Sequence, residues 1–472
     1  MRWMPSLGCV AAMGAALMTT AVASAATADG ELPRRGCLGV QVFGTTTGMM
    51  IVGVVPEGPA QRAGLQPMDQ IVALNGSPIA DATPSGYLRG LAEGEEVTLT
   101  LRRSGADREV TLRLAAPRTP DIPDALTEFG EVRMESGARV RTIRTVPFGG
   151  ADRLRPAVLF IQNTDCATID PEVPPGDGWT DLVESVAQQG YVTMRIDKPS
   201  VGDSEGPDCA SMDYWAEVEI FRSAMAALVA DARVDPTRVF IIATRGGTTI
   251  APLLAREIDV AGVCVFSPVV RPWFEHTMTQ LRRQSADWSM PPLQAEKMLH
   301  DCAELLTRVM VLGEEPDAVV AADASLAPLA QSLGGDRLFG RSAAFHAQLN
   351  DADIAAAWVM AETNVLVLRG EYDRYSIEAD QHLIERLVNG ATGTLAWTAT
   401  IARTDPDMNP QPGPDYYKTK WSAIDAAPNP ELRETIVEWM EYALARREGK
   451  PEGAPDHRSL QAERPAAAQP ES

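Results

Sequence analysis

The residues that most suggest chemistry lie between Val239 and Ala255, where an apolar strand pattern runs through a tight glycine turn into a helical pattern. A strand, one sharp turn and a helix form a nucleophile elbow, whose pattern Gly-x-Ser-x-Gly exposes a serine at the apex. The five elbow positions here are Ala243-Thr244-Arg245-Gly246-Gly247, so the final glycine is kept and Arg245 stands where the serine belongs. A guanidinium stays protonated at neutral pH and cannot act as a nucleophile.

Other motifs of residues 130–447 support the interpretation of this turn as an elbow. They are Asp197–Pro207, Asp235–Val239 and Val365–Asp373. Together with the elbow they resemble the secreted α/β hydrolases of the serine-peptidase or esterase type. The resemblance implies a triad made of the elbow serine, an acid after the seventh strand and a histidine after the eighth, in that chain order.

The acid position of this triad is kept, and the base position is not. Asp373 closes the loop Gly370–Asp373 after a strand, where the family has its aspartate. After the next strand the family has Asp-His, and this chain has Asp405-Pro406. None of the five histidines stands at the base position: His276, His300, His346, His382 and His457. Without an imidazole even a serine at the elbow would be a weak nucleophile. The missing serine and the missing histidine therefore both indicate that the triad is not functional.

Two nearby segments bear on the same interpretation. Gly202–Gly206 matches Gly-x-Ser-x-Gly literally, but Ser204 follows six residues of loop and no helix starts after it, so we expect an ordinary loop. The family often has a glycine after the strand Ala157–Gln162, where backbone N–H groups bind an oxyanion. Here Asn163-Thr164-Asp165 follows, and the charge of Asp165 has the wrong sign for that role.

A separate set of motifs fills residues 36–116. They are the loop Cys37-Leu38-Gly39-Val40, the helical Gly58–Leu65 and the hairpin Asp69–Gly76. This segment resembles a PDZ domain of the bacterial, protease-associated type, with Met68 where the family usually has glycine. The resemblance implies that the Cys37–Val40 loop holds the terminal carboxylate of an extended peptide or protein, and that the following strand pairs with it. The alternative is a PDZ domain that packs within the chain and binds nothing in trans.

Composition narrows the possible partners. The net charge of −22 over 472 residues argues against nucleic acid and against an anionic membrane surface. Arg2, an apolar run and Ala23-Ser24-Ala25 predict a signal peptide over residues 1–25, hence a periplasmic or secreted protein. No later segment has the apolar length of a membrane span. The cysteines lack C-x-x-C spacing and the histidines are scattered, so we expect no metal and no cofactor. The oligomeric state is left open.

The pattern of elements predicts an α/β fold, a doubly wound, mostly parallel sheet with a helical lid, preceded by a small, mainly β PDZ domain. Strands are expected at Ala157–Gln162, Tyr191–Asp197, Arg238–Ala243, Gly262–Ser267, Asn364–Arg369 and Gly393–Thr398. Helices are expected at Trp179–Gln189, Asp213–Asp231, Gly247–Glu257, Glu378–Asn389 and Glu431–Arg446. The predicted boundaries are a linker at 117–129, the hydrolase-like domain at 130–447 with its lid at 268–362, and a disordered tail at 448–472.

Two contacts are predicted within this frame. Cys166 and Cys209 lie in loops that this family's strand order brings to the same edge of the sheet, which implies a disulfide. Arg245 and Asp373 are expected to form an ion pair across the gap left by the missing imidazole, with an Arg245 that binds an anion as the alternative.

Three functions remain open. The first is an exported PDZ protein with an inactive hydrolase-like domain that binds or regulates. The second is an active hydrolase with an unrecognised nucleophile, such as Ser204, Ser267 or an elbow threonine. The third is a structural partner of an active paralogue or envelope protease, with the PDZ domain as adaptor. The guanidinium at the elbow favours the first and third over the second.

Overall fold

The structure is a computed structural model that describes residues 32–45, 47–79, 88, 90–117, 119, 121–149, 153–169, 178–288, 290–391, 394–415 and 429–449. The predicted signal peptide lies outside the described residues, as does the predicted tail beyond Gly449. No helix in the described part of the chain is long and apolar enough to cross a bilayer.

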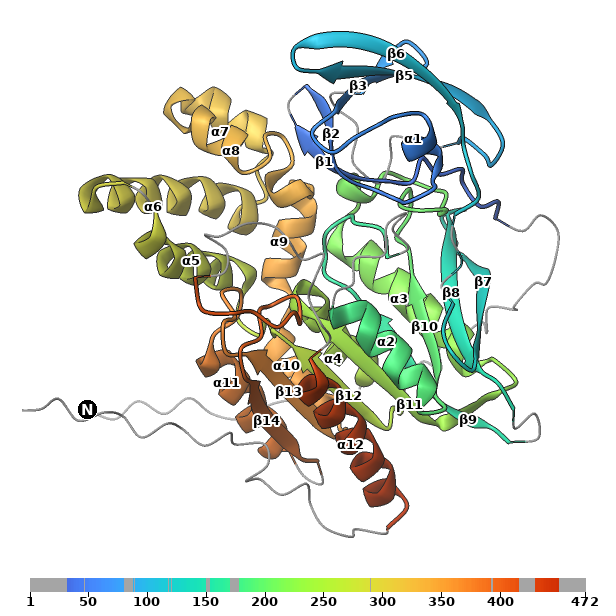
Figure 1. Ribbon diagram of the computed structural model, residues 1–472. Coiled ribbons are helices and arrows are strands. Elements are labelled where there is room, and N and C mark those ends of the chain that lie inside the picture. The colour runs from blue at the N-terminus through green and yellow to red at the C-terminus, as the bar shows by residue number, and fades with distance from the viewer. Residues whose placement is uncertain are drawn as a thin grey trace, which may run out of the picture. The chain divides into compact units, whose positions relative to one another are not determined.

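In its described residues, the N-terminal module is an antiparallel sheet with one short helix (Figure 1). Its elements are β1 (Val40–Thr45), β2 (Gly48–Val54), α1 (Pro59–Arg62), β3 (Gln70–Leu74), β4 (Ser77–Pro78), β5 (Glu96–Arg103) and β6 (Ala106–Arg113). The strand order is β1-β2-β3-β5-β6, with β4 paired to β3. Inward residues such as Leu38, Ile51 and Leu99 form a core of their own. Along β5 buried residues such as Val97, Leu99 and Leu101 alternate with more exposed ones, as expected of a strand with one face on a core.

The second module is built on an eight-stranded sheet in the order β14-β13-β12-β11-β9-β10-β8-β7. Its strands are β7 (Ala125–Arg133), β8 (Arg139–Pro147), β9 (Arg155–Ile161), β10 (Val192–Ile196), β11 (Val234–Thr244), β12 (Gly262–Phe266), β13 (Val365–Gly370) and β14 (Ala396–Ile401). The six strands from β9 to β14 run parallel, and β7 and β8 pair antiparallel at one edge. All six predicted strands are present. β7 begins at Ala125, inside the predicted 117–129 linker, so regular structure starts earlier than the proline pattern indicated.

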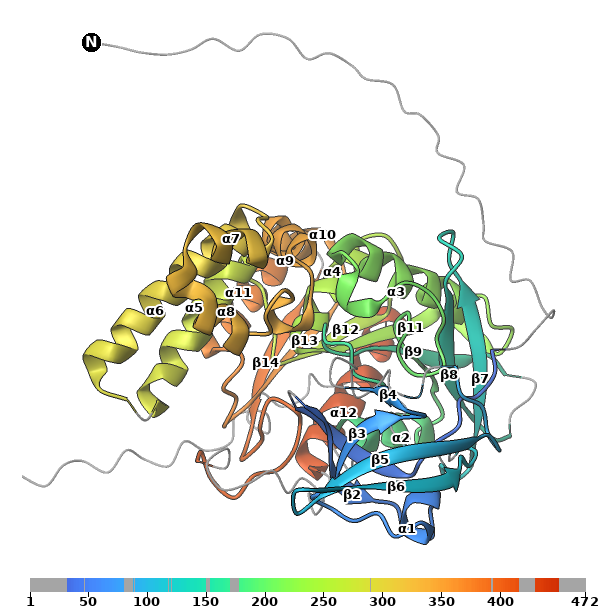
Figure 2. The same ribbon diagram turned by 90° about the horizontal axis from the view of Figure 1, so that it is seen from above.

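Helices cover both faces of this sheet, as Figure 2 shows. They are α2 (Gly178–Gln188), α3 (Tyr214–Val229), α4 (Ile250–Ala255), α11 (Glu378–Asn389) and α12 (Pro430–Arg447). Residues of α2 and α12 pack on strand side chains such as Phe160 and Phe240 to form one core. Residues of α3, α4 and α11 pack on the alternate side chains, such as Leu159 and Ile241, to form the other. Because successive side chains of a strand point to opposite faces, a strand covered on both sides is apolar throughout. The doubly wound architecture is thus confirmed.

The long segment between β12 and β13 is helical. It contains α5 (Trp273–Gln284), α6 (Pro292–Leu306), α7 (Pro316–Ala322), α8 (Ala327–Ser332), α9 (Ala343–Asp351) and α10 (Ile354–Met360). Buried residues of this segment, among them Leu305, Phe345 and Trp358, join the core that α3 and α4 form on the sheet. The segment predicted as a lid is therefore a packed part of the domain.

Candidate functional site

The turn after β11 has the backbone geometry of an elbow and carries Arg245 at its apex. β11 ends at Thr244, and Arg245 has a φ of 48°, a left-handed conformation that side-chain-bearing residues rarely adopt. A 3-10 turn over Arg245–Thr249 follows and leads into α4, so the predicted helix starts later than the glycine pattern indicated. The two glycines make the tight turn possible, since a Cβ on Gly247 would lie 2.2 Å from the carbonyl oxygen of Gln162. The sharp, strained turn of a nucleophile elbow is therefore present with arginine at its apex.

Arg245 is paired with an aspartate of the loop that follows β14. Its Nη2 lies 2.7 Å from Oδ1 of Asp407. Asp407 directly follows Pro406, the residue that stands at the expected base position. The side chains are 26% and 48% exposed, respectively. Burial opposes the charge of Arg245, but the attraction of Asp407 and Asp165 outweighs it and raises the arginine pKa. A salt bridge thus joins the residue at the nucleophile position to the residue that follows the base position of the family pattern.

Asp373 does not take part in that salt bridge, and the predicted Arg245–Asp373 ion pair is wrong. The Asp373 carboxylate is 2% exposed. It accepts hydrogen bonds from Oγ of Ser267 (2.8 Å) and Ser376 (2.5 Å), and from the backbone N–H groups of Tyr375 (2.7 Å) and Ser376 (2.9 Å). Four donors thus satisfy this buried carboxylate. The prediction failed because it assumed that removing the imidazole would leave Asp373 without partners.

The backbone N–H that would bind an oxyanion is already engaged. In this fold the residue after the nucleophile supplies one of those donors. Here Gly246 N donates to Oδ1 of Asn163 at 3.1 Å, and Asn163 Nδ2 donates to Asp165 at 2.7 Å. Burial alone would raise the pKa of Asp165, but Lys198 and Arg245 outweigh it and hold that pKa below its usual value. A negative charge therefore stands beside the amide that a hydrolase keeps for an oxyanion.

Both alternative serine nucleophiles are buried and hydrogen-bonded within the scaffold. Ser204 is 5% exposed; its Oγ donates to Asp197 O and accepts from Arg141 N, each at 2.8 Å. It lies in the loop after β10, as the sequence context predicted. Ser267 is fully buried at the end of β12, and its Oγ donates to Asp373. Neither hydroxyl contacts a histidine among the described residues, so neither has the base that activates a serine.

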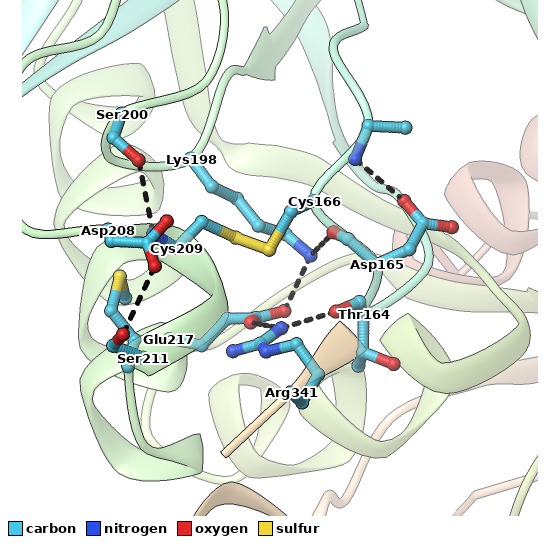
Figure 3. The surroundings of a disulfide bond; sticks show 12 residues. Thr164, Asp165, Cys166, Lys198, Ser200, Asp208, Cys209, Ser211, Glu217 and Arg341 are labelled. Atoms are coloured by element: carbon cyan, nitrogen blue, oxygen red, sulfur yellow. Dashed lines mark hydrogen bonds and ion pairs between the residues drawn. A yellow bond between two sulfur atoms is a disulfide. The ribbon is translucent and has the colours of Figure 1, made fainter. Parts of the chain in front are cut away.

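A disulfide and a buried ion cluster fix the loop after β9, which includes Thr164, Asp165 and Cys166 (Figure 3). The predicted Cys166–Cys209 bond is present, with the two Cα atoms 5.9 Å apart. Lys198 Nζ lies 2.8 Å from Glu217 and donates to the carbonyl oxygens of Asn163 and Asp165, each at 2.7 Å.

Arg341, from the segment predicted as a lid, completes this cluster. Its guanidinium lies 2.5 Å from the Glu217 carboxylate and also contacts the carbonyl oxygen of Thr164. Glu217 therefore lies between two cations (Figure 3), and all three side chains are at most 2% exposed. The sequence did not reveal this cluster, although Lys198 lies two residues after the end of β10.

A cavity of about 160 Å³ lies beside the elbow. Its walls come from the loop after β9, the start of α2, the elbow and the loop after β14, and they include Gln162, Asp165, Trp179, Arg245 and Asp407. Its lining contains both polar side chains, such as Asp165 and Arg245, and apolar ones, such as Ile169 and Met408. No group of three or more His, Cys, Asp and Glu side chains is placed to hold a metal in the described parts of the chain.

The predicted carboxylate-binding loop of the N-terminal module leads directly into β1. Leu38 is buried, its carbonyl oxygen accepts from Ala60 N (2.9 Å), and Gly39 has a φ of 74° while its carbonyl oxygen accepts from Val55 N (2.8 Å). Cys37 N donates to the carbonyl oxygen of Ala115 (2.9 Å), and Val40 is the first residue of β1. β1 is the terminal strand in the order of the described sheet. The loop therefore stands next to the strand on which peptide pairing is expected.

Comparisons with known proteins agree with this division into two modules. Residues 36–114 match the family model of the PDZ domain. A putative zinc metalloprotease of Neisseria meningitidis is 32% identical over 121 residues, which are 25% of this chain and 26% of that protein. An esterase of Thermotoga maritima is 23% identical over 139 residues, which are 29% of this chain and 32% of that protein. The chain thus spans about a third or less of the length of these curated relatives.

Solved structures of low sequence identity also align with the chain. An esterase of Pyrococcus furiosus aligns with a TM-score of 0.41 at 12% identity, over 68% of this chain and 91% of that one. An acylaminoacyl peptidase of Pyrococcus horikoshii aligns with a TM-score of 0.44 at 10% identity, over 78% of this chain and 49% of that one. The family match at residues 36–114, the doubly wound sheet and the elbow therefore describe a PDZ domain followed by a domain of the α/β hydrolase fold.

Proposed function

We propose that this chain is an exported, peptide-binding PDZ protein whose α/β hydrolase-like domain has lost hydrolysis and serves as an adaptor or regulator. The observation that carries the proposal is Arg245 at the elbow apex, paired with Asp407 of the loop that would supply the base. A guanidinium attacks no carbonyl, and Pro406 accepts no proton. The predicted signal peptide supports the exported location.

The oxyanion site supports the same conclusion independently of the nucleophile. Stabilising the developing oxyanion is worth several kcal/mol to an acyl-transfer enzyme. Gly246 N already donates to Asn163, whose own amide donates to Asp165. A substrate carbonyl would have to displace Asn163 and then lie close to the Asp165 carboxylate, which opposes a negative charge on oxygen.

Turnover assays test the loss of hydrolysis. The full chain is incubated with p-nitrophenyl acetate, p-nitrophenyl butyrate and aminoacyl p-nitroanilides, and rates are compared with those of a heat-denatured sample. The proposal predicts no difference. A rate above background that saturates with substrate, survives Ser204→Ala and disappears in Arg245→Ala would refute it.

Peptide capture by the PDZ domain is the other half of the proposal. Its support is the family match and the position of the Cys37–Val40 loop before β1. Extended peptides with an apolar C-terminal residue are expected to bind the full chain with a Kd of about 1–10 µM. Fluorescence anisotropy with a library of labelled C-terminal peptides measures this. C-terminal amides of the same peptides are the control and should bind at least about tenfold more weakly. Equal binding of acids and amides would contradict carboxylate capture.

A further inference from the structure

Two arginines without a carboxylate partner meet at one backbone oxygen in the hydrolase-like domain. Arg283, in the last turn of α5, donates from Nη2 to the carbonyl oxygen of Asp373 at 3.2 Å. Arg369, near the end of β13, donates from its own Nη2 to the same oxygen at 3.5 Å. Neither guanidinium forms an ion pair in the described part of the chain. Two cations therefore lie close together with no anion between them.

A shortage of acidic residues does not explain this arrangement. The chain has 64 acidic residues against 42 lysines and arginines, so carboxylates are in excess. Other arginines of the same region each have one: the pairs are Arg271–Asp380 (2.5 Å), Arg282–Glu296 (2.9 Å) and Arg374–Asp287 (2.8 Å). The carboxylate of Asp373 is already occupied by its four donors. The positive charge of Arg283 and Arg369 is thus a local exception in an acidic protein.

The first turn of α11 adds positive charge at the same place. Arg283 Nη1 donates to the carbonyl oxygen of Ser376 at 2.7 Å, and Ser376 directly precedes Ile377, the N-cap of α11. Ile377 has no side-chain cap hydrogen bond, and the backbone N–H groups at a helix N-terminus carry a partial positive charge. The acids of that turn lie against other groups, Asp380 against Arg271 (2.5 Å) and Glu378 against the His382 ring (3.6 Å).

The two guanidiniums also affect each other electrostatically. Partial burial is the main cause that lowers the pKa of Arg283, and repulsion by Arg369 is the next. Like charges held together in this way are stabilised by an anion that contacts both. Arg283 is exposed and Arg369 is partly exposed, so an anion from solvent can reach the pair.

The donors that remain set the chemistry of this anion. A guanidinium has five N–H donors in a planar fork, and Arg283 uses two of them on carbonyl oxygens. Nε of Arg369 is buried, which leaves its two Nη atoms for a ligand. Forks of this kind match the oxygens of a phosphate or a carboxylate. A phosphate monoester carries a charge close to −2 at pH 7 and compensates both cations, whereas a carboxylate compensates only one.

We propose that Arg283 and Arg369 bind the phosphate group of a small phosphate monoester, or inorganic phosphate itself. The phosphate oxygens accept from the free N–H groups of both guanidiniums, beside the start of α11. The net charge of −22 favours a small soluble ligand over an anionic lipid surface. The site lies apart from Arg245, and the inference does not depend on the loss of hydrolysis.

Isothermal titration of the full chain with inorganic phosphate and with glycerol 3-phosphate, at constant ionic strength, tests the site. Both are expected to bind with a Kd of about 1 mM or tighter, and acetate at least about tenfold more weakly. No heat from either phosphate up to about 20 mM overturns the inference. Acetate binding as tightly as phosphate also overturns it, because the pair would then take any small anion.

Variants locate the binding at this pair. Arg283→Gln and Arg369→Gln each remove one cation and are expected to weaken phosphate at least about tenfold. Arg282→Gln is the matched control, since Arg282 neighbours Arg283 in the chain but is paired with Glu296; it should leave the Kd unchanged. Thermal unfolding checks that each variant is folded. Unchanged affinity in the folded Arg283→Gln and Arg369→Gln variants, or an equal loss in Arg282→Gln, would refute the assignment.

Protection from phenylglyoxal, which modifies accessible guanidiniums, tests the site in the wild type without any substitution. Modified peptides are mapped by mass spectrometry with and without 20 mM phosphate, a concentration on the order of ten times the expected Kd or more. Phosphate is expected to slow the modification of Arg283 and Arg369 at least about fivefold and to leave that of Arg282 unchanged. Equal modification of Arg283 with and without phosphate would contradict the inference.

Vesicles distinguish the source of the phosphate group. Phosphatidic acid presents a phosphate monoester on a membrane, and sedimentation with vesicles that contain it measures binding to that form. The account predicts no sedimentation above that seen with phosphatidylcholine alone, because the net charge of the chain opposes an anionic surface. Binding to these vesicles without binding to either soluble phosphate would overturn the proposed small ligand.

Discussion

Arg245 Nη2 lies 2.7 Å from Asp407 Oδ1 and thereby joins the nucleophile elbow to the loop after β14. In an active α/β hydrolase these two segments carry the serine and the histidine that activates it. Here the first holds a permanent cation and the second an aspartate directly after Pro406. In this chain a salt bridge therefore connects the two segments.

The two aspartates near the elbow are predicted to differ sharply in their contribution to stability. Asp407→Asn should lower the free energy of unfolding by less than about 1 kcal/mol, because both partners of its salt bridge are partly exposed. Asp373→Asn should lower it by about 2–4 kcal/mol, because the buried carboxylate accepts from four donors and an amide opposes some of them. Urea unfolding measures both. A larger loss in Asp407→Asn than in Asp373→Asn would contradict the hydrogen-bond assignments.

The Cys166–Cys209 disulfide is predicted to stabilise the hydrolase-like domain by about 3–4 kcal/mol, since it closes a loop with a sequence separation of 43. The double variant Cys166→Ala/Cys209→Ala should lose that amount in urea unfolding. Dithiothreitol should lower the stability of the wild type toward that of the double variant. The same reductant should leave the double variant unchanged, and an equal effect on both proteins would show that another bond is responsible.

Acid is predicted to loosen the helical segment through His346. This side chain is 1% exposed; its Nδ1 accepts from Trp273 Nε1 at 3.0 Å, and its Nε2 donates to the carbonyl oxygen of Leu338 at 2.7 Å. Burial lowers the pKa of His346 to about 4, so the ring is neutral in the folded protein near pH 7. Its ordinary pKa in the unfolded chain is about 6.5.

The sign of the effect follows from this depressed folded-state pKa. The contribution of neutral His346 to the free energy of unfolding is fully present above pH 6.5. It is lost as the pH falls toward 4, where the loss is on the order of 3 kcal/mol. His346→Gln should therefore show a flatter stability profile between pH 6.5 and 4 than the wild type. His300→Gln, at an exposed position of the same helical segment, is the matched control. Parallel profiles for His346→Gln and the wild type would sink the prediction.

Met68 is predicted to be a strained position in the PDZ domain. It has a φ of 74°, and its side chain is 73% exposed. The left-handed conformation costs a side-chain-bearing residue about 1–2 kcal/mol, and glycine avoids most of that at an entropic cost of about 0.5–1 kcal/mol. Met68→Gly should therefore raise the unfolding free energy by about 0.5 kcal/mol, whereas Met68→Ala should not. Equal stability of the two variants would show that φ is not the cause.

The sequence predicted those strands that form continuous apolar runs, because such runs can be recognised without knowing which elements pack against them. The strands β9 to β14 are buried on both faces, so their apolar runs could be recognised without knowing their neighbours. The hairpin β7–β8 was missed because it stands at the sheet edge and carries charged residues such as Glu128, Arg139 and Arg144. The start of β7 falls within the predicted linker, because Pro117, Pro120 and Pro123 precede it.

The sequence allowed the residues of the candidate site to be identified, but it did not allow their contacts to be predicted. Arg245 and Pro406 could be assigned to their positions from the order of motifs along the chain. The partner of Arg245 depended on the conformation of the loop after β14, and tertiary contacts such as the hydrogen bond from Gly178 N to Asn409 Oδ1 (3.0 Å) help to set that conformation. The bond between Asn163 and Gly246 likewise joins residues 83 positions apart, and no local pattern encodes it.

The most direct test of the central claim is labelling with a fluorophosphonate probe, which reacts covalently with activated serines. The purified wild type and Arg245→Ser are incubated with the probe, and labelled peptides are mapped by mass spectrometry, with an active serine esterase as the positive control. The account predicts that neither protein is labelled above its heat-denatured sample, because Arg245 is no nucleophile and Pro406 supplies no base to a serine placed there. Labelling of the wild type at Ser204, Ser267 or any other serine, above the heat-denatured sample, would contradict the loss of hydrolysis.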